Sequence, residues 1–190
     1  MIAINLRPTL QLTDVEFEQL CHSNPELRLE RTATGNLVVM SPAGSETGHY
    51  NAELSTELTL WNRRTQLGIT FDSSAGFTLP NGAIRSPDAS WILKTRWATV
   101  PLSQRRKFAP ICPDFVVELK SPSDEWAELQ RKLREYLDNG AQLGWLLNPE
   151  TRRVEVYRPQ QVLESLQAPT SLSGEPVLPG FTLDLRVVWG

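Results

Sequence analysis

Prolines and glycines are spread along the whole chain, and their spacing limits the length of every element that it can form. The sequence has 190 residues, of which 14 are proline and 11 are glycine, and it contains no internal repeat. Both residue types interrupt regular helices and strands. We therefore expect many short elements in one domain over residues 1–190, since domains commonly contain about 100–200 residues. The core is expected over about residues 10–160, with an irregular C-terminal segment over 161–190 that contains one short strand.

The composition excludes several classes of protein. Hydrophobic residues make up 40% of the chain and charged residues 22%, which is typical of a globular protein and excludes a disordered or rod-like one. The formal net charge of −3 excludes a protein that coats DNA with a uniformly basic surface. A function on nucleic acid would need a local positive groove or a metal ion.

Cysteine usage and the lack of long apolar runs bear on the compartment. Cys21 and Cys112 are too few for a disulfide framework, and we predict that both are buried free thiols in a reducing compartment. No apolar run approaches the roughly 18 residues that a membrane-spanning helix requires. The expected location is the cytoplasm.

The order of the predicted elements indicates an α/β fold. Thr13 and Glu16 form a capping box at the start of a first helix, and residues 27–40 are typical of a β-hairpin. A long helix over about 46–66 follows. Strands are then expected over 69–72, 76–79, 83–92, 115–120, 143–147 and 154–157, of which the one over 83–92 is interrupted by Pro87. An amphipathic helix capped by Ser123 is expected over 124–138. Strands with helices on both sides predict a mixed sheet.

One predicted strand carries charges where buried strands are apolar. Glu118 and Lys120 are two residues apart, so their side chains lie on the same face of the strand over residues 115–120. In an apolar surrounding, a carboxylate and an ammonium need each other or a ligand. An ion pair that faces solvent on a half-exposed sheet is the simpler alternative.

Asp88 adds a second carboxylate from another segment. It follows Pro87 at the point where a neighbouring strand begins or bends. A hard divalent cation binds several oxygens from separate segments, which Asp88, Glu118 and the Leu119 carbonyl can supply. Lys120 would then hold an attacking water or stabilise developing negative charge. Asp114 lies about 13 Å from Glu118 along the same strand, so the two cannot share an ion.

These residues resemble a known nuclease signature. Pro87-Asp88 with Glu118-Leu119-Lys120 is similar to the motif of the PD-(D/E)XK nuclease superfamily. Further stretches, in the same order, resemble the Uma-type "putative restriction endonuclease" family, which is abundant in cyanobacteria. They are Leu37–Pro42, Arg85–Ile92, Pro113–Ser123, Lys132–Tyr136, and Gly144-Trp145 with Asn148-Pro149, and they cover most of residues 10–160.

The resemblance implies a restriction-endonuclease-like mixed sheet flanked by helices, with an N-terminal hairpin extension. It implies hydrolysis of DNA phosphodiester bonds with Mg²⁺, for which Mn²⁺ can substitute. It also implies one more acidic residue from the N-terminal part, and Glu30 and Glu46 are the two candidates.

Two functions stay open. The first is a Mg²⁺-dependent DNA endonuclease with Asp88 and Glu118 as metal ligands. The second is a non-catalytic nuclease-fold module that binds DNA or protein in association with mobile elements. Because cleavage of both strands by one small domain usually takes two copies, we expect a homodimer with Trp189 in part of the contact.

Two basic clusters could contact a phosphate backbone. One is Arg105-Arg106-Lys107, and the other is Arg131-Lys132 with Arg134. Clusters of this kind are also typical of a solvated surface.

Overall fold

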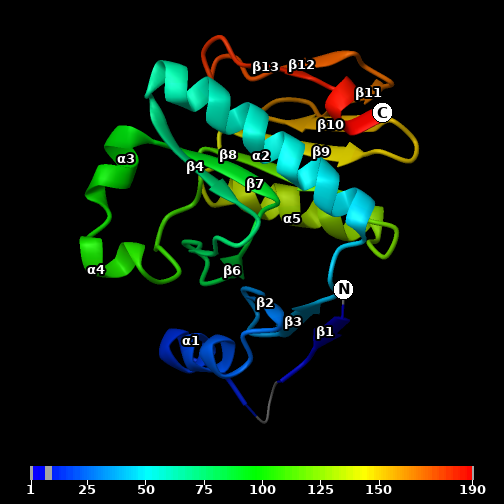
Figure 1. Ribbon diagram of the computed structural model, residues 1–190. Coiled ribbons are helices and arrows are strands. Elements are labelled where there is room, and N and C mark those ends of the chain that lie inside the picture. Colours follow the sequence, from blue (N-terminus) through cyan, green and yellow to red (C-terminus); the bar gives the residue numbers. More distant parts are fainter. Residues whose placement is uncertain (1, 7–9, 190) are drawn as a thin grey trace.

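A six-stranded mixed sheet forms the centre of the molecule. The computed structural model describes residues 2–6 and 10–189 (Figure 1). The strand order is β11-β10-β9-β8-β7-β4. The strands are β4 (Gly68–Asp72), β7 (Ala89–Leu93), β8 (Phe115–Leu119), β9 (Leu143–Asn148), β10 (Arg153–Tyr157) and β11 (Glu164–Gln167). All neighbours are antiparallel except β8 and β9, so the predicted mixed α/β fold is confirmed.

Helix α5 (Trp126–Asp138) connects the one parallel pair, β8 and β9. A parallel pair needs such a crossover. The helix packs closely on the sheet, because a Cβ at Gly144 of β9 would lie only 2.6 Å from a methyl carbon of Leu133. The prediction that Ser123 caps this helix is wrong. Glu125 is the N-cap residue, and no side chain caps the helix there. Just before it, the Asp124 carboxylate accepts from the N–H and the hydroxyl of Ser121 and so closes a turn.

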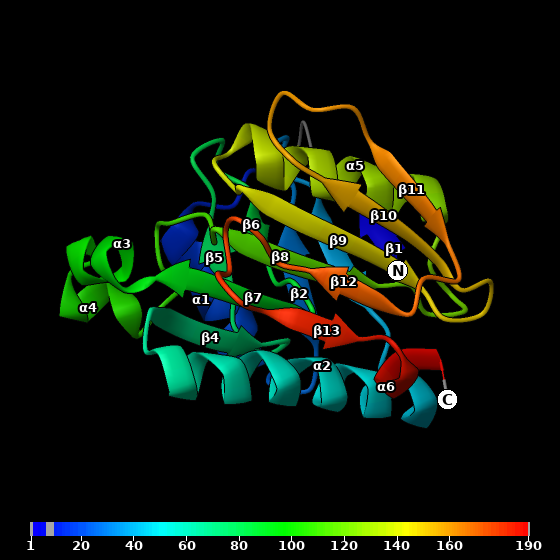
Figure 2. The same cartoon turned by 90° about the horizontal axis from the view of Figure 1, so that it is seen from above.

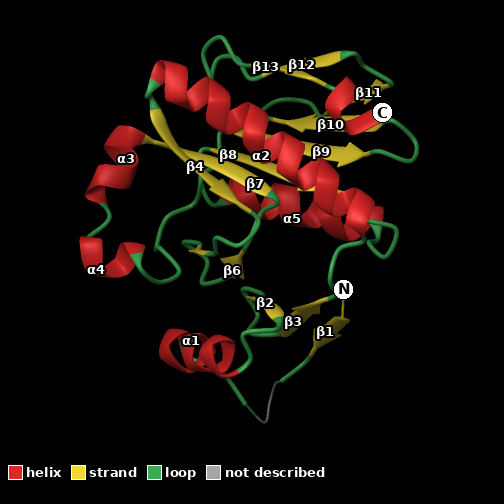
Figure 3. Cartoon of the chain, viewed as in Figure 1, coloured by secondary structure: helices red, strands yellow, loops and turns green. Residues whose placement is uncertain are grey.

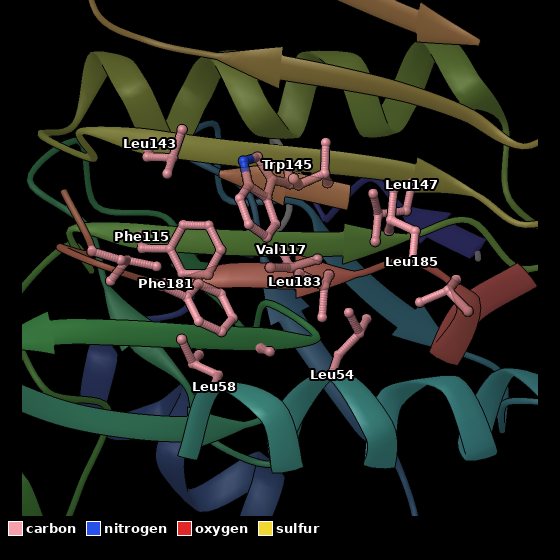
Figure 4. Close-up of a cluster of buried hydrophobic side chains, with 14 of the residues drawn as sticks. Leu54, Leu58, Phe115, Val117, Leu143, Trp145, Leu147, Phe181, Leu183 and Leu185 are labelled. Atoms are coloured by element: carbon pink, nitrogen blue, oxygen red, sulfur yellow. The ribbon is translucent and has the colours of Figure 1, made fainter. Parts of the chain in front are cut away.

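The two faces of the sheet are covered by different helices. Helix α2 (Ser45–Thr65) covers one face with Leu54 and Leu58, which Figure 4 labels, and with Trp61. Helix α5 covers the other face, and Figure 2 shows the two helices on opposite sides of the strands. Along β8, Val117 belongs to the α2 side and Val116 to the α5 side. By the same alternation Glu118 points to the side of α5.

The C-terminal segment is more ordered than the sequence predicted. It contains β12 (Ser171–Ser173), β13 (Thr182–Asp184) and the short helix α6 (Arg186–Trp189). Leu172, Phe181 and Leu183 are buried in the cluster on the α2 face (Figure 4). The indole of Trp189 donates to the Pro169 carbonyl at 3.0 Å, so it contacts its own chain.

A second, five-stranded sheet contains the N-terminal hairpin. Its strand order is β1-β3-β2-β6-β5, and helix α1 (Asp14–Ser23) begins with the predicted capping box at Thr13. The strands are β1 (Ile2–Ile4), β2 (Arg28–Arg31), β3 (Leu37–Met40), β5 (Phe77–Thr78) and β6 (Ile84–Arg85). Figure 3 shows α1 and strands β1 to β3 together below the central sheet.

Residues 83–92 connect the two sheets rather than forming one strand. β6 lies in the N-terminal sheet and β7 lies in the central sheet, with Pro87 between them. Proline lacks a backbone donor, so a ladder ends there. Asp88 is thereby held at the junction of the two sheets.

Two short helices, α3 (Lys94–Thr99) and α4 (Leu102–Arg105), project from the end of β7. They lie on the same side of the molecule as α1 (Figures 1 and 2). Among the described residues, no helix is both long and apolar enough to cross a membrane.

Candidate active site

Asp88 and Glu118 face each other across the β7–β8 pair. Ala89 pairs with Val117 in antiparallel register, and the Asp88 N–H donates to the Val117 carbonyl at 3.0 Å. This register puts Asp88 directly opposite Glu118, and directly opposed residues share a face. Both line one cavity of about 310 Å³, so the structure brings these two carboxylates together.

Backbone and side-chain donors fix the Asp88 carboxylate. Its Oδ2 accepts from the Leu119 N–H at 2.9 Å, and its Oδ1 accepts from Nδ2 of Asn51 on α2 at 3.2 Å. Burial raises the pKa of Asp88, although the Leu119 N–H opposes the rise. The amide oxygen of Asn51 is buried and has no partner within the described residues. An oxygen acceptor beside Asp88 is therefore left unsatisfied.

Glu118 is buried against two side chains of α5. It is 3% exposed, and its Oε1 lies 2.8 Å from Nζ of Lys132 and accepts from the Tyr136 hydroxyl at 3.2 Å. Burial raises the pKa of Glu118 to about 8, against the opposing charge of Lys132. The nearby negative charges of Asp88 and Glu30 add to that rise. A divalent cation would replace the proton that this environment favours.

Glu30 lies behind Glu118 and is joined to it by Lys132. Glu30 is fully buried, and its Oε1 lies 2.9 Å from the Lys132 ammonium. It also accepts from the Ser86 N–H at 2.9 Å and pairs with Arg85 at 3.0 Å. Burial opposes ionisation of Glu30, but the charges of Lys132 and Arg85 hold its pKa below the usual range. Glu30 is thus an ionised anchor between the hairpin and the site.

Glu46, the other acidic candidate, lies elsewhere. It is exposed in the first turn of α2, where the Tyr50 hydroxyl donates to it at 3.1 Å. Its neighbour Thr47 lines the cavity, but Glu46 does not. Of the two candidates, only Glu30 is connected to Glu118.

Lys120 and Leu119 follow Glu118 at the end of β8. Leu119 lines the cavity, whereas Lys120 does not. The Lys120 ammonium donates to the Ser121 carbonyl at 3.0 Å. The cation in contact with Glu118 is therefore Lys132, from α5, and not the lysine of the strand.

Arg28, Ser121 and Asp124 complete the polar wall of the cavity. Arg28 comes from β2, and its positive charge also opposes the rise in the pKa of Asp88. The Asp124 carboxylate accepts from the Ser121 N–H at 3.0 Å and from the Ser121 hydroxyl at 2.6 Å. The wall therefore combines groups from the N-terminal sheet and from the β8–α5 loop.

Comparison with known families identifies the family of the chain. The family described as "Putative restriction endonuclease", Uma2, matches residues 14–186. The chain belongs to the Uma2 family. The resemblance found in the sequence is thereby confirmed. No curated protein matches the chain.

A solved structure shares the Uma2 fold seen here. It is a crystal structure of a putative nuclease belonging to DUF820 from Anabaena variabilis ATCC 29413. The two chains are 22% identical, with a TM-score of 0.77, and the match covers 94% of this chain and 97% of that one. The likeness establishes the fold of this Uma2 protein.

The residues of this Uma2 site fit a hard divalent cation. Two opposed carboxylates and the unpartnered amide oxygen of Asn51 offer oxygen ligands of the kind that Mg²⁺ accepts. In residues 2–6 and 10–189, no group of three or more His, Cys, Asp and Glu side chains is placed to hold a metal. Mg²⁺ commonly uses only one or two carboxylates and keeps several waters, so this donor set is sufficient.

Sequence reasoning missed the roles of Lys132 and Asn51. Lys132 was placed in a basic cluster that could contact phosphate, which is wrong, because it is only 5% exposed. Helical spacing carried the signal, since Lys132 is three residues after Leu129 and four before Tyr136, both of which face the core. Asn51 had no comparable signal, because its partner Asp88 is 37 residues away.

Proposed function

We propose that this Uma2 protein is a Mg²⁺-dependent DNA endonuclease with a PD-(D/E)XK site. The observation that carries the proposal is the opposition of Asp88 and Glu118 across β7 and β8, in one cavity at the junction of the two sheets. Carboxylates opposed in this way repel each other unless a cation or a proton lies between them. Mn²⁺ is expected to substitute for Mg²⁺.

Asp88 and Glu118 would hold the metal, with the Leu119 carbonyl and the Asn51 amide oxygen as further oxygen ligands. Bound Mg²⁺ would supply positive charge to a phosphoryl oxygen and lower the pKa of a coordinated water. Leu119 and Asn51 fix the orientation of Asp88, while Lys132 and Tyr136 fix that of Glu118. These contacts hold both carboxylates before substrate arrives.

Lys120 and Arg28 are the cations proposed to act on substrate. Lys120 adjoins Ser121, which lines the cavity, and a change of its side-chain rotamer would bring its ammonium to the attacking water. Arg28 lines the cavity from β2 and is positioned for a phosphate oxygen. In the reaction, the water oxygen bonds to phosphorus, one ester P–O bond breaks, and the leaving oxygen takes up a proton.

The test is cleavage of supercoiled plasmid by the purified protein with Mg²⁺, Mn²⁺ or EDTA. Asp88→Asn and Glu118→Gln should each lower the rate by about 100-fold or more, because each removes a charged metal ligand. Each tenfold loss of rate corresponds to about 1.4 kcal/mol of activation free energy. Asp138→Asn, at an exposed carboxylate near the end of α5, is the matched control. Cleavage in EDTA, or full activity of Asp88→Asn, would disprove the proposal. DNA binding without cleavage would favour the non-catalytic module.

We also propose that the active form is a homodimer in the cytoplasm. One chain carries one such cavity with two carboxylates, so cutting both strands of a duplex calls for two copies. The two free cysteines suit a reducing compartment. Light scattering at micromolar concentration tests the dimer, and a monomer with double-strand cleavage would contradict it.

A further inference from the structure

A second cavity lies away from Asp88 and Glu118. It has a volume of about 490 Å³ and lies where α1, the β4–β5 segment and the residues after α4 meet. Its walls include four aromatic side chains, Phe71, Phe77, Trp97 and Phe108. Phe71, Trp97 and Phe108 are only half-buried, so they present ring surface to the cavity.

The aromatic walls are held by their neighbours. The Phe71 ring lies edge-on to Trp97, with centroids 5.1 Å apart, and edge-on to Phe77, with centroids 5.2 Å apart. A Cβ at Gly76 would lie 2.5 Å from the Phe108 ring, so glycine lets that ring pack against the strand. The cavity is therefore a built feature and not a gap between mobile side chains.

A basic segment forms the rim of this cavity. Arg105, Arg106 and Lys107 all line it. The Arg105 guanidinium lies 5.3 Å from the centroid of the Trp97 ring, and Lys107 pairs with Glu18 of α1 at 2.7 Å. Arg106 is exposed, and its side chain has no partner within the described residues. Arg106 is thus available to an anionic ligand at the mouth of this cavity.

A middle cavity lies between the aromatic cavity and the candidate active site. A middle cavity of about 310 Å³ shares Cys21 and Phe108 with the aromatic cavity. The same middle cavity shares Arg28 and Met40 with the cavity of Asp88. Arg28 also donates to the Ser73 carbonyl at 2.7 Å, so it reaches from the N-terminal sheet to the β4–β5 turn. Three adjoining cavities therefore follow one another from Asp88 to Trp97, and we call this row the groove.

We propose that this groove binds single-stranded DNA, with an unpaired base in the aromatic cavity and the backbone passing Arg106 and Arg28. This inference rests on the proposed nuclease function. The substrate of that nuclease would be DNA with an unpaired segment beside the cleavage point. Aromatic rings and cations along one groove are the elements that bind single strands. The rings lie inside a cavity, and a base can enter only after it leaves the duplex stack.

The charge pattern supports the same ligand. The chain carries a net charge of −3, so DNA cannot be held by the surface as a whole. The groove carries Arg28, Arg105, Arg106 and Lys107 along its length. Its carboxylates are Glu18, which pairs with Lys107, and Asp88, Glu118 and Asp124 at the candidate active site, so Arg106 and Arg28 are the cations left for phosphate. A phosphate backbone between the cations and a base on the rings would use both features.

The test measures binding of a labelled oligonucleotide of about 12 nucleotides, single-stranded or as a duplex, by fluorescence anisotropy in EDTA. We expect the single strand to bind roughly tenfold more tightly than the duplex. Arg106→Glu should weaken single-strand binding by roughly tenfold and reduce its salt dependence. Arg64→Glu, at an exposed arginine in the last turn of α2, is the matched control.

Trp97→Leu tests the aromatic wall, because it keeps apolar volume and removes the large ring. It should weaken single-strand binding roughly tenfold. Equal affinity for single strand and duplex, or equal effects of Arg106→Glu and Arg64→Glu, would overturn the proposal. If Trp97→Leu fails to fold, the comparison of Arg106→Glu with Arg64→Glu still tests the proposal. Plasmid cleavage is measured separately, so loss of cleavage with groove binding intact would contradict the nuclease function alone.

Discussion

The ammonium nitrogen of Lys132 lies 2.8 Å from Oε1 of Glu118, deep between α5 and β8. The same nitrogen lies 2.9 Å from Glu30 on β2, so one buried lysine joins two carboxylates from different sheets. Glu30 in turn pairs with Arg85, and Arg85 pairs with Glu135 at 2.6 Å. The N-terminal hairpin is therefore coupled by charge to the residue proposed to hold the metal.

Lys132→Met should destabilise the fold strongly. It removes one of the two cations that keep buried Glu30 ionised and the only one of them that contacts Glu118, and breaking a buried ion pair by removal of one partner costs about 3–5 kcal/mol. The free energy of unfolding from urea titration measures the loss. Arg131→Met is the matched control, because Arg131 is exposed on the same helix and its partner Glu128 lies 3.6 Å away. Equal losses in the two variants would contradict the role of Lys132.

Asp88→Asn should leave the metal-free protein as stable as the wild type, or more stable by up to about 1 kcal/mol. The change removes a negative charge opposite Glu118, and the amide oxygen can still accept from the Leu119 N–H. Mg²⁺ should raise the melting temperature of the wild type and not that of the variant.

Thermal melts in EDTA and in Mg²⁺ check this, with Asp138→Asn as the control for loss of a carboxylate. A clear fall in melting temperature in EDTA for Asp88→Asn alone would mean that Asp88 has a structural role. In that case Mg²⁺ would also have no effect on the wild type.

The sequence predicted the central part of the site because the signals there are local. The period of a strand gave the face of Glu118, and Pro87 marked the break before Asp88. The register between β7 and β8 then brings Asp88 beside Glu118, because residues of neighbouring strands lie opposite one another. The strand face and the break at Pro87 are local features, whereas the register between β7 and β8 is set by the fold.

Local features of the sequence do not show which lysine contacts Glu118. Lys120 is two residues from Glu118 in the sequence, but the chain leaves β8 there and its ammonium turns to the Ser121 carbonyl. Lys132 reaches Glu118 only because α5 docks on the sheet at a definite angle and depth, through Leu133 against Gly144. A docking geometry of this kind is a tertiary property, which single-sequence periodicity does not contain.

The C-terminal segment shows the same limit. β12 and β13 have only three residues each, with exposed serine and threonine side chains. So short a polar pattern carries little strand signal. The segment becomes ordered by contact, through buried Phe181 and through the Trp61 indole, which donates to the Pro179 carbonyl at 3.0 Å.

Stability should depend on pH through Glu118. Its pKa is about 8 in the folded protein and about 4.5 in the unfolded chain, so the folded state favours the proton. The stabilising contribution of protonated Glu118 is complete below about pH 4.5 and is lost as the pH rises to about 8. In Glu118→Gln the side chain has no ionisable group, so this contribution to stability does not change with pH.

We therefore expect the free energy of unfolding of the metal-free wild type to fall relative to that of Glu118→Gln over this range. The change should be a few kcal/mol, at about 1.4 kcal/mol for each unit of pKa difference. Urea unfolding at a series of pH values in EDTA measures it. A constant difference between the two proteins would show that Glu118 does not titrate there.

Single-stranded DNA should protect Cys21 from alkylation and leave Cys112 unaffected. Cys21 is half-buried and lines both the aromatic cavity and the middle cavity of the groove. Burial raises the pKa of the Cys112 thiol to about 12, and since the thiolate is the reactive form, Cys112 should react only after unfolding. With an oligonucleotide at ten times its Kd, modification of Cys21 by iodoacetamide should slow roughly tenfold. Peptide mass spectrometry resolves the two sites, and the same reaction in urea, where DNA should have no effect, is the control. An unchanged rate for Cys21 at saturating single strand would mean that the DNA does not pass through the groove.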